Sequence, residues 1–554
     1  MCAFNAAGST QKSNVAGDSP PPQRLLRKHS VETPINVRRL AGLLNRHSDH
    51  SFSHFVLHGL CHDFTIGHSA AISGVHSSPN HLSAIRNMQY VSSYLTECCE
   101  AGQTAGPFPE PPFLCMQTSG LGVVPKSNGK FRVIHDLSSP DGSSVNDAIP
   151  RGQFSLHYDS VDTAIAAIMR LGKGSLLTKV DIRNAFRLCP VAPSDWHFLG
   201  IRWNGMYYYE KVLPFGLRSS PFIFNQLATA INWVLVHVGS LPDVMHNLDD
   251  FLDICPPSSS LAAKHKAIIL DLFQFLNIPV ATEKVEGPST VLTFLGLELD
   301  TDRLEVRLPQ SKLLALRRLV STTLDQGCVL KRELASLLGH LSFVSRAIPA
   351  ARTFLRRLYD LNKATSEMSS HRMLHLSASA KGDLSWWHQT LSTWNGKSFF
   401  LLEKWMPSAD LQLQTDASGT IGFGAFFNGR WFRGDWSPQQ LELSITYKEL
   451  FAIVAACATW GIEWLRLRVE FQCDNQAVVE CLKTGTSRSP AVMALIRTLY
   501  SICVKHNFLI RASHLPGISN TIADALSRNK MGAFRTFAPT AAERPDTMVQ
   551  PITE

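Results

Sequence analysis

Apolar and polar residues follow one another along this chain with the spacings of strands and helices. Between residues 114 and 300, short apolar runs such as 130–137 and 178–186 predict strands. Longer stretches with an apolar face, such as 161–171 and 221–237, predict helices that alternate with these strands. This middle part of the chain is therefore expected to mix strands and helices in one α+β arrangement.

The pattern changes twice more towards the C-terminus. From 301 to about 400, leucines recur at helical spacing, which predicts a helical region. Strands are then expected at 412–416, 422–427 and 429–436, followed by a helix that begins near Tyr447. A further strand, up to Asp474, and more helices complete the pattern. A chain of 554 residues with this pattern is expected to form several domains.

Three carboxylates interrupt the apolar runs in the middle of the chain. Asp249 and Asp250 are adjacent in an apolar, hairpin-like stretch, and Asp181 ends the run 176–180. Acids flanked by Leu, Phe and Ile are costly to bury unless a cation pairs with them. Two strands that bring the three together could hold two Mg²⁺ ions, and such a pair suits phosphoryl transfer.

A second set of acids lies in the C-terminal pattern. Each acid ends a predicted strand or lies early in a predicted helix, and the four are Asp416, Glu449, Asp474 and Asp524. Scattered acids at such positions also suit a centre of two metal ions. The sequence therefore predicts two separate metal-dependent sites.

The motifs around the first acids resemble the palm of retroelement reverse transcriptases. They are, in chain order, 180–187 (VDIRNAFR), 213–221 (LPFGLRSSP), the paired acids and 294–299 (FLGLEL). Upstream, 121–126 (LGVVPK) and 130–137 (KFRVIHDL) resemble the fingers strands of these enzymes. The series of four acids, placed after a polymerase, resembles ribonuclease H.

The resemblance is strongest to the polymerase of DIRS-type retroelements, which is similar to that of gypsy-like elements. It runs from about residue 34 to 528 and rests on 130–138, 142–147, 352–358, 383–387 and 394–396. It implies an α+β multidomain fold, a right-hand polymerase followed by an α/β ribonuclease H-like domain. The segments expected are a disordered N-terminal segment (1–33), a mostly helical N-terminal extension (34–113), fingers and palm (114–300), a helical basic thumb and connection (301–408), a ribonuclease H domain (409–530) and a flexible tail (531–554).

The resemblance also implies roles for residues of the polymerase. Asp181, Asp249 and Asp250 would bind the metals, and Lys284 would act as a general acid on pyrophosphate. Phe186 matches the aromatic gate that excludes a ribose 2′-hydroxyl, although a core aromatic remains the alternative. The remaining substrate-binding candidates are Lys126 and Arg132, which match the grip on the triphosphate, and Phe215 and Gly216.

In the ribonuclease H series, Asp416, Glu449, Asp474 and Asp524 would bind two further metal ions. His514 is expected to assist product release or proton transfer, and Asn520 to orient the site. We expect two Mg²⁺ ions in each active site, with Mn²⁺ as a substitute. The expected partners are an RNA template, a DNA primer, an RNA–DNA hybrid and dNTPs, with a tyrosine recombinase on a separate chain.

Charge and composition add a basic segment. Residues 303–372 hold 13 Lys and Arg against 5 Asp and Glu, which accounts for the whole net charge of +8. Such a segment after a palm is expected to contact phosphates without reading sequence, whereas a solvated helix face is the alternative. No apolar run approaches 18 residues and no signal layout opens the chain, so we expect no membrane partner and no secretion.

The 12 cysteines lack C-x₂-C pairs, which favours reduced thiols in an intracellular protein, cytoplasmic or nuclear. Two other functions stay open. Asn247 stands where such polymerases usually carry Tyr before the paired acids, which favours a weakened or host-adopted nucleic-acid-binding relic. A third hypothesis is an enzyme with ribonuclease H activity alone.

Overall fold

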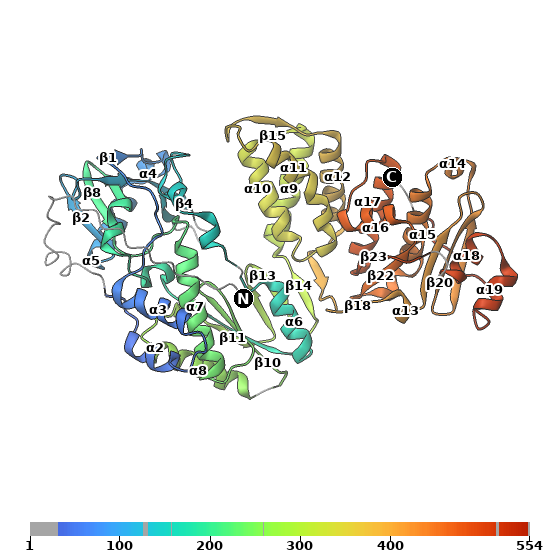
Figure 1. The fold of residues 1–554 in the computed structure, drawn as a ribbon, viewed down its shortest axis with the longest axis horizontal. Helices are drawn as coiled ribbons and strands as arrows, with labels where there is room; N and C mark the ends of the chain where they lie inside the picture. The colour runs from blue at the N-terminus through green and yellow to red at the C-terminus, as the bar shows by residue number, and fades with distance from the viewer. Residues whose placement is uncertain (1–31, 126–130, 157, 259, 517–519, 552–554) are drawn as a thin grey trace, which may run out of the picture. The chain divides into compact units, whose positions relative to one another are not determined.

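The computed structural model describes residues 32–551, apart from 126–130, 157, 259 and 517–519. The chain forms two compact units, whose elements Figure 1 labels. One unit comprises Met1–Tyr158, Val180–Phe251 and Ala267–Glu283, and the other Asp159–Lys179, Leu252–Lys266 and Lys284–Glu554. The fold is an α+β multidomain fold, as predicted.

A five-stranded sheet in the order β1-β3-β7-β8-β2 forms part of the first unit. Its strands are β1 (Val75–Ser77), β2 (Thr104–Phe108), β3 (Met116–Thr118), β7 (Gly200–Trp203) and β8 (Met206–Glu210). Both edge strands, β1 and β2, come from residues expected to be mostly helical. Short strands with few apolar residues give little periodicity, which is why the pattern did not reveal them.

Two further strands and several helices complete this unit. β4 (Gly120–Pro125) pairs with β5 (Phe131–Asp136), which confirms the strand predicted at 130–137 to within one residue. The helices are α2 (Val37–Leu44), α3 (His50–His62), α4 (Leu82–Arg86), α5 (Met88–Glu100) and α7 (Ser220–His237), with the 3₁₀ turns η1 (Val145–Ala148), η2 (Arg151–Phe154), η3 (Ala185–Leu188) and η4 (Pro193–Phe198). α7 confirms the helix predicted at 221–237.

The strands that carry the paired acids belong to a four-stranded sheet, in the order β11-β6-β10-β9. These strands are β6 (Leu176–Asp181), β9 (Val244–Asn247), β10 (Asp250–Cys255) and β11 (Glu286–Ser289), and the division between the units runs through β6 and β10. The strand predicted at 178–186 ends early, at Asp181. Asn184 adopts the left-handed conformation, with φ of 53°, and begins the turn η3. A strand cannot continue through that conformation.

The second unit holds the helices expected between 301 and 400. They are α9 (Gln310–Gln326), α10 (Lys331–Val344), α11 (Arg356–Ala364) and α12 (Ala378–Thr393), with η6 (Pro349–Leu355) between α10 and α11. Short strands accompany them: β12 (Val291–Phe294), β13 (Leu297–Asp300), β14 (Glu305–Arg307), β15 (Cys328–Leu330), β16 (Met373–His375) and β17 (Lys397–Phe399). An earlier helix of this unit is α6 (Val161–Leu171), which has the predicted bounds, whereas the division between the units runs through α8 (Leu261–Phe275) and η5 (Thr282–Lys284).

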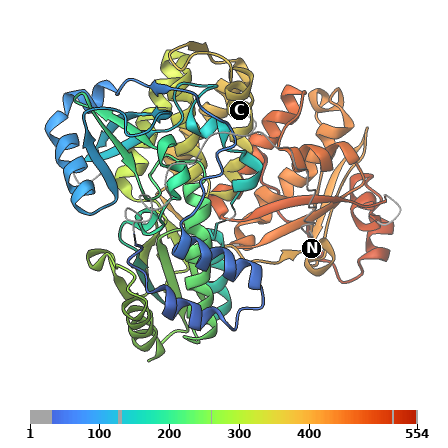
Figure 2. The same cartoon turned by 60° about the vertical axis from the view of Figure 1, so that its left-hand side comes forward.

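The C-terminal part of this unit contains two three-stranded sheets, β19-β20-β21 and β18-β22-β23. The strands are β18 (Trp405–Met406), β19 (Leu413–Ala417), β20 (Gly422–Phe427), β21 (Arg430–Asp435), β22 (Arg468–Cys473) and β23 (Leu509–His514). The helices are α13 (Ser408–Leu411), α14 (Pro438–Leu441), α15 (Ile445–Trp460), η7 (Gly461–Trp464), α16 (Gln476–Thr484), α17 (Pro490–His506), α18 (Thr521–Ser527) and α19 (Met531–Phe537). Figure 2 shows these strands and helices together, in orange to red.

One helical stretch of this part is long and apolar enough to cross a membrane by length and composition. It covers Ile445–Trp464, has a mean hydropathy of 1.3, and 72% of it is buried inside the structure. Lys448 and Glu449 interrupt its apolar residues near the start, so the sequence shows no unbroken apolar run of that length there. A helix enclosed in a protein core passes the same test, so the finding is weak evidence for a membrane.

Residues after 530 pack against the C-terminal part instead of forming the flexible tail expected. Phe534 is fully buried in a cluster with Trp431 and Leu526. Two indoles also donate hydrogen bonds to this segment: Trp431 Nε1 to the Ala542 carbonyl at 2.8 Å, and Trp460 Nε1 to Asp546 Oδ2 at 2.7 Å. The polar composition of the segment concealed these few anchoring contacts.

A buried ion pair ties η3 to β8 in the first unit. Arg187 Nη1 lies 2.5 Å from Glu210 Oε2, and both side chains are almost fully buried. Tyr94 Oη accepts a further hydrogen bond from Arg187, and Thr104 Oγ1 donates to Glu210. Burial raises the pKa of Glu210, but the charge and hydrogen bonds of Arg187 outweigh it and hold that pKa below its ordinary value.

Replacing Glu210 by Gln should destabilise the first unit by about 3–5 kcal/mol, because Arg187 then keeps its charge in the interior without a counter-charge. The measurement is the shift in urea unfolding monitored by circular dichroism.

Glu283→Gln is the matched control, since its partner Arg183 is 3.1 Å away on the surface and the two side chains are 64% and 52% exposed. That change should cost less than about 1 kcal/mol. Equal effects of the two changes would contradict the prediction.

Candidate active sites

The first three acids meet where β6 ends and β10 begins. Asp181 is the last residue of β6 and is 4% exposed, whereas Asp249 and Asp250 are half-buried at the turn into β10. The Ile182 N–H donates a hydrogen bond to the Asp249 carbonyl at 3.0 Å. This bond holds the residue after Asp181 against Asp249, so the structure brings the predicted acids together.

Aromatic rings lie beside this junction. The ring of Phe186 in η3 is 8% exposed and lies 4.9 Å from the ring of Phe215, measured between centroids. The guanidinium of Arg132, from β5, stands over Phe215 at 5.6 Å. Three of the predicted substrate-binding side chains, from separate elements, therefore form one contiguous surface.

Gly216 lets the segment after Phe215 approach β5 closely. It has a φ of 99°, and a Cβ added there would meet the His135 carbonyl oxygen at 2.3 Å. Only glycine fits such a backbone and such a contact. Its carbonyl accepts a hydrogen bond from Asn146 Nδ2 at 2.8 Å, and Asn146 Oδ1 in turn accepts the Arg218 N–H at 2.7 Å. Sequence reasoning gave Asn146 no role, although it lies in one of the motifs quoted for the resemblance.

The described part of the first unit contains neither of two other polymerase candidates. Lys284 is exposed in η5 and begins a segment of the second unit, and Lys126 falls outside the described residues. Asn247, the departure from the family pattern, is the half-buried last residue of β9. The motif at 294–296 forms a two-residue turn between β12 and β13, where Leu295 and Gly296 both have positive φ.

The second set of acids converges on β19. Asp416 lies on β19 and Glu449 on α15, and each is 6% exposed. Asp474 follows β22 directly, and Asp524 lies on α18, with its side chain 37% exposed. One carboxylate oxygen each from Glu449 and Asp474, together with Cys473 Sγ, lie within 4.8 Å of one another. α15 and α18 both pack against β19, which brings these acids to one place.

The charges of these carboxyl groups affect one another's pKa. Burial, followed by the charges of Asp416 and Asp474, raises the pKa of Glu449 to about 9. Burial also raises the pKa of Asp416 to about 6. The charges of Asp524 and Asp474 raise this pKa further, whereas a hydrogen bond from the Ser527 hydroxyl lowers it. Oxygen donors held together against their own repulsion fit a divalent cation such as Mg²⁺.

The supporting residues of this site were partly predicted. Asn520 Nδ2 donates to the Thr415 carbonyl at 2.8 Å and reaches Asp416 Oδ1 at 3.4 Å. His514 is the exposed last residue of β23. It pairs with Cys473, the residue just before Asp474. Arg528 Nε donates to Asp524 Oδ1 at 2.5 Å. Sequence reasoning gave Ser527 and Arg528 no role, because their partners are identified only by the fold.

Comparison with known proteins identifies the segment that contains the first three acids. Residues 124–299 match the family model described as reverse transcriptase (RNA-dependent DNA polymerase). This segment is a reverse transcriptase domain. It is homologous to the polymerases of retroviruses and retrotransposons.

Three curated relatives illustrate this. The Pro-Pol polyprotein of feline foamy virus is 25% identical over 244 residues (43% of this chain, 18% of the relative). The Gag-Pro-Pol polyprotein of Mason-Pfizer monkey virus is 24% identical over 273 residues (47% of this chain, 14% of the relative). The transposon Tf2-3 polyprotein of Schizosaccharomyces pombe is 23% identical over 426 residues (73% of this chain, 28% of the relative). The chain thus spans less than a third of the length of each. Among solved structures, a foamy viral protease-reverse transcriptase in complex with RNA/DNA hybrid aligns with a TM-score of 0.45 and 13% identity, covering 86% of this chain and 63% of that one.

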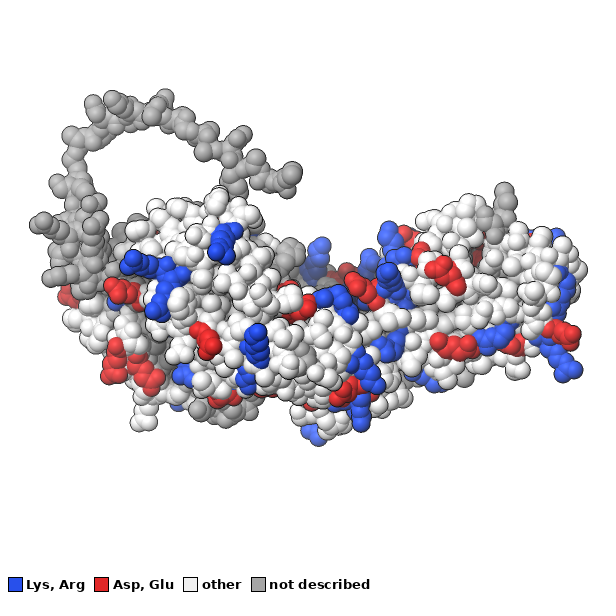
Figure 3. Space-filling view, turned by 90° about the horizontal axis from the view of Figure 1, so that it is seen from below, with Lys and Arg blue, Asp and Glu red and all other residues white. Residues whose placement is uncertain are grey.

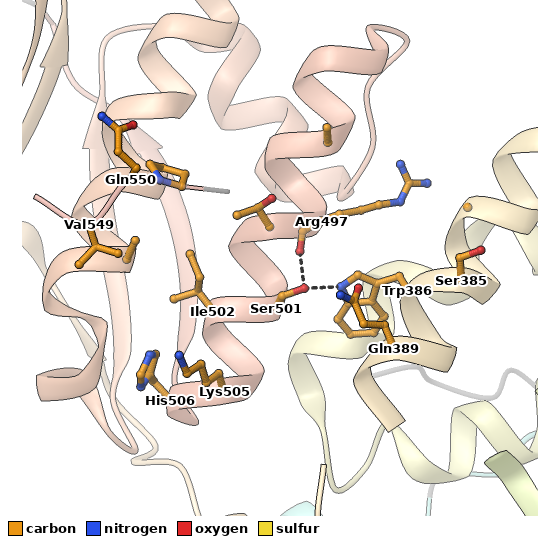
Figure 4. A pocket seen from close by; sticks show the side chains of 15 residues that line it. Ser385, Trp386, Gln389, Arg497, Ser501, Ile502, Lys505, His506, Val549 and Gln550 are labelled. Carbon is orange, nitrogen blue, oxygen red and sulfur yellow. Dashed lines mark hydrogen bonds between the residues drawn. The ribbon is translucent and has the colours of Figure 1, made fainter. Parts of the chain in front are cut away.

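A cavity of about 690 Å³ lies between α12 and α17, in the second unit. Figure 4 shows Trp386, whose Nε1 donates to Ser501 Oγ at 2.9 Å, and Ser501, which donates to the Arg497 carbonyl. None of the seven acids lines the cavity. The reverse transcriptase domain does not contribute to it either, so we do not assign it to either active site.

The basic segment 303–372 divides into structural and exposed side chains. Arg307 pairs with Glu298 and Glu305, and Arg357 pairs with Asp383 at 2.9 Å, so both are engaged within the fold. The exposed members are Arg303, Lys312, Arg318, Arg332, Arg346, Arg352, Arg356, Lys363 and Arg372. On the face drawn in Figure 3, basic side chains lie among acidic and uncharged ones. The exposed members are those available for phosphate contacts.

The raised pKa of Glu449 predicts a pH dependence for the metal-free protein. A carboxyl whose pKa is about 9 in the fold and 4.5 in an unfolded chain stabilises the fold below pH 4.5. That contribution is lost as the pH rises through 9. In EDTA, Glu449→Gln should therefore be more stable than the wild type at pH 8.5, on the order of 1–3 kcal/mol, and the advantage should shrink at pH 5.

Thermal unfolding at the two pH values, in EDTA and in Mg²⁺, measures this. The control is Glu480→Gln on α16, whose side chain is 56% exposed. Mg²⁺ should remove the advantage of Glu449→Gln, because the wild-type carboxylate is then a ligand. A wild type that is more stable than Glu449→Gln at pH 8.5 in EDTA would refute the electrostatic account.

Proposed function

We propose that this chain is a retroelement reverse transcriptase that extends a DNA primer on RNA and DNA templates and cleaves the RNA strand of RNA–DNA hybrids. The observation that carries the proposal is the hydrogen bond between Ile182 and Asp249. It holds Asp181 and the acidic pair together inside a reverse transcriptase domain. The cluster of Asp416, Glu449 and Asp474 supports the second activity.

Asp181, Asp249 and Asp250 would hold two Mg²⁺ ions at the polymerase site, or Mn²⁺ in their place. Such ions supply charge neutralisation at the triphosphate and a lower pKa for the attacking hydroxyl. Arg132 would bind phosphate oxygens of the incoming dNTP through its fork of donors. Phe186, held against Phe215, would exclude a ribose 2′-hydroxyl and so select deoxynucleotides.

At the ribonuclease H site, Asp416, Glu449, Asp474 and Asp524 would hold the cations beside the scissile phosphate of the RNA strand. Asn520 would orient Asp416, since its amide already reaches that carboxylate. His514, exposed beside Cys473, would exchange protons with solvent or assist release of the cut strand. The exposed basic side chains of 303–372 would follow the hybrid by contacts with phosphates.

We further infer a DIRS-type origin, with a tyrosine recombinase as a separate chain and action inside the cell. The support is the set of motifs at 130–138, 142–147, 352–358, 383–387 and 394–396. Copurification of this chain with a recombinase from the same element tests that partner.

Asn substitutions should separate the two activities. Asp249→Asn should lower primer extension on poly-rA/oligo-dT by more than about 100-fold and leave cleavage of a labelled RNA–DNA hybrid unchanged. Asp474→Asn should do the reverse. In each case a metal ligand of one site loses its charge while the other site keeps all of its acids.

Two exposed acids serve as controls, Asp271→Asn on α8 and Asp410→Asn on α13, and both activities should survive in each. No extension by the wild type, or extension by Asp249→Asn at the wild-type rate, would overturn the polymerase proposal. Tight binding of hybrid without incorporation would favour the relic, for which Asn247 is the motivating residue. Hybrid cleavage without extension would favour the ribonuclease H enzyme alone.

Phe186→Val should weaken the discrimination against ribonucleotides. The ratio of kcat/KM for dTTP to that for UTP should fall by about 10-fold or more, because the ring no longer fills the space beside the sugar. Single-nucleotide incorporation measures both constants. Phe222→Val on α7, whose ring packs against Phe154, is the control and should leave the ratio unchanged. An unaltered ratio in Phe186→Val would make Phe186 a core aromatic, the alternative noted from the sequence.

A further inference from the structure

Three potential metal ligands lie together in the second unit, apart from the seven acids. Asp253 and Cys255 project from the same face of β10, two residues apart, and His265 comes from α8. The carboxylate of Asp253 is fully buried, Cys255 is 0% exposed, and His265 is 9% exposed. One ligand atom of each residue lies within 4.8 Å of those of the other two.

The three atoms form a nearly equilateral triangle. Cys255 Sγ lies 3.1 Å from His265 Nδ1 and 3.3 Å from Asp253 Oδ2, and His265 Nδ1 lies 3.1 Å from the same carboxylate oxygen. A point just above such a triangle is about 2.0–2.3 Å from all three atoms, which are the bond lengths of zinc to nitrogen, oxygen and sulfur. The arrangement thus has the size of a metal-binding triad.

Hydrogen bonds account for two sides of the triangle, because Asp253 Oδ2 can accept from both the thiol and the ring N–H. The ring nitrogen carries either one proton or one lone pair, so it makes one linear hydrogen bond, not two. Here it lies at hydrogen-bond distance from both the thiol and the carboxylate. A single cation satisfies all three contacts at once, because each ligand atom then faces the ion.

A nucleophilic role for Cys255 fits the structure poorly. A catalytic thiol must meet its substrate, and this sulfur has no exposed surface. An ion needs far less space than a substrate. Structural zinc usually has four ligands, so these three would leave one position for a further donor. Thiolate, imidazole and carboxylate together favour Zn²⁺ over Mg²⁺, which prefers oxygen ligands.

We propose that Asp253, Cys255 and His265 bind one Zn²⁺ ion, which fastens α8 to β10. The ion is distinct from the Mg²⁺ ions of the proposed active sites. Its place is on the strand that begins with Asp250, three residues beyond that acid. Its role is to hold the structure, so the proposal does not depend on either catalytic activity.

Zinc content and cobalt spectroscopy test this with the full-length chain. The wild type, exchanged into buffer with one equivalent of Zn²⁺ and then dialysed, should retain about one zinc per chain by mass spectrometry of metals. Co²⁺ in its place should give a thiolate-to-cobalt charge-transfer band in the near ultraviolet. Both signals should be lost in Cys255→Ala and strongly reduced in His265→Gln, because each removes a ligand.

Cys473→Ala is the matched control, since that thiol lies beside Glu449 and Asp474 in the other cluster that could hold an ion. It should keep the zinc and the cobalt band. Circular dichroism checks that each variant folds, and Asp253→Asn provides a further ligand change of nearly equal size. A wild type that retains no zinc, or a cobalt band that survives Cys255→Ala, would overturn the proposal. Loss of the band in Cys473→Ala but not in Cys255→Ala would do the same and would place the ion at the acidic cluster.

Discussion

Repulsion between carboxylates held close together is the interaction that shapes the cluster of Asp416, Glu449 and Asp474. Two other buried acids are neutralised by guanidinium groups, Glu210 by Arg187 and Asp383 by Arg357. Asp416 instead accepts hydrogen bonds from a hydroxyl and an amide, which position it without cancelling its charge. The fold therefore keeps the negative potential of the site for a ligand that carries positive charge.

The framework around the first three acids links stability to the position of the Phe186 ring. Phe186 and Arg187 are neighbours in η3, yet one ring packs against Phe215 while the next side chain enters the ion pair with Glu210. The ion pair fixes η3 against β8, so it also fixes the ring that would contact the sugar. Gly216 has a comparable effect. Its close approach to β5 places the Phe215 ring next to the guanidinium of Arg132. The positions of the side chains that would contact substrate thus follow from contacts within the protein that involve no substrate.

The sequence predicted a helix or strand correctly where the residues that determine it lie close together in the chain. α6 and β20 have the predicted bounds because their periodicity is contained in a few turns or residues. The end of β6 was missed because the left-handed Asn184 leaves no trace in an apolar pattern. Residues after 530 and the edge strands β1 and β2 were also missed, since partners more than 40 residues away order them. Family motifs located the acids, but the roles of Asn146 and Ser527 required the fold, which alone identifies their partners.

The two acidic clusters differ in how much of the fold each requires. Asp249 and Asp250 share one turn, and pairing of β10 with β6 suffices to add Asp181. Asp416, Glu449, Asp474 and Asp524 come from β19, α15, the end of β22 and α18, so four packed elements must be in place at once. Each added element contributes its own ordering entropy before the acids converge. The second cluster is therefore the one whose geometry responds first to local unfolding, and a cation that binds all four elements would also hold them together.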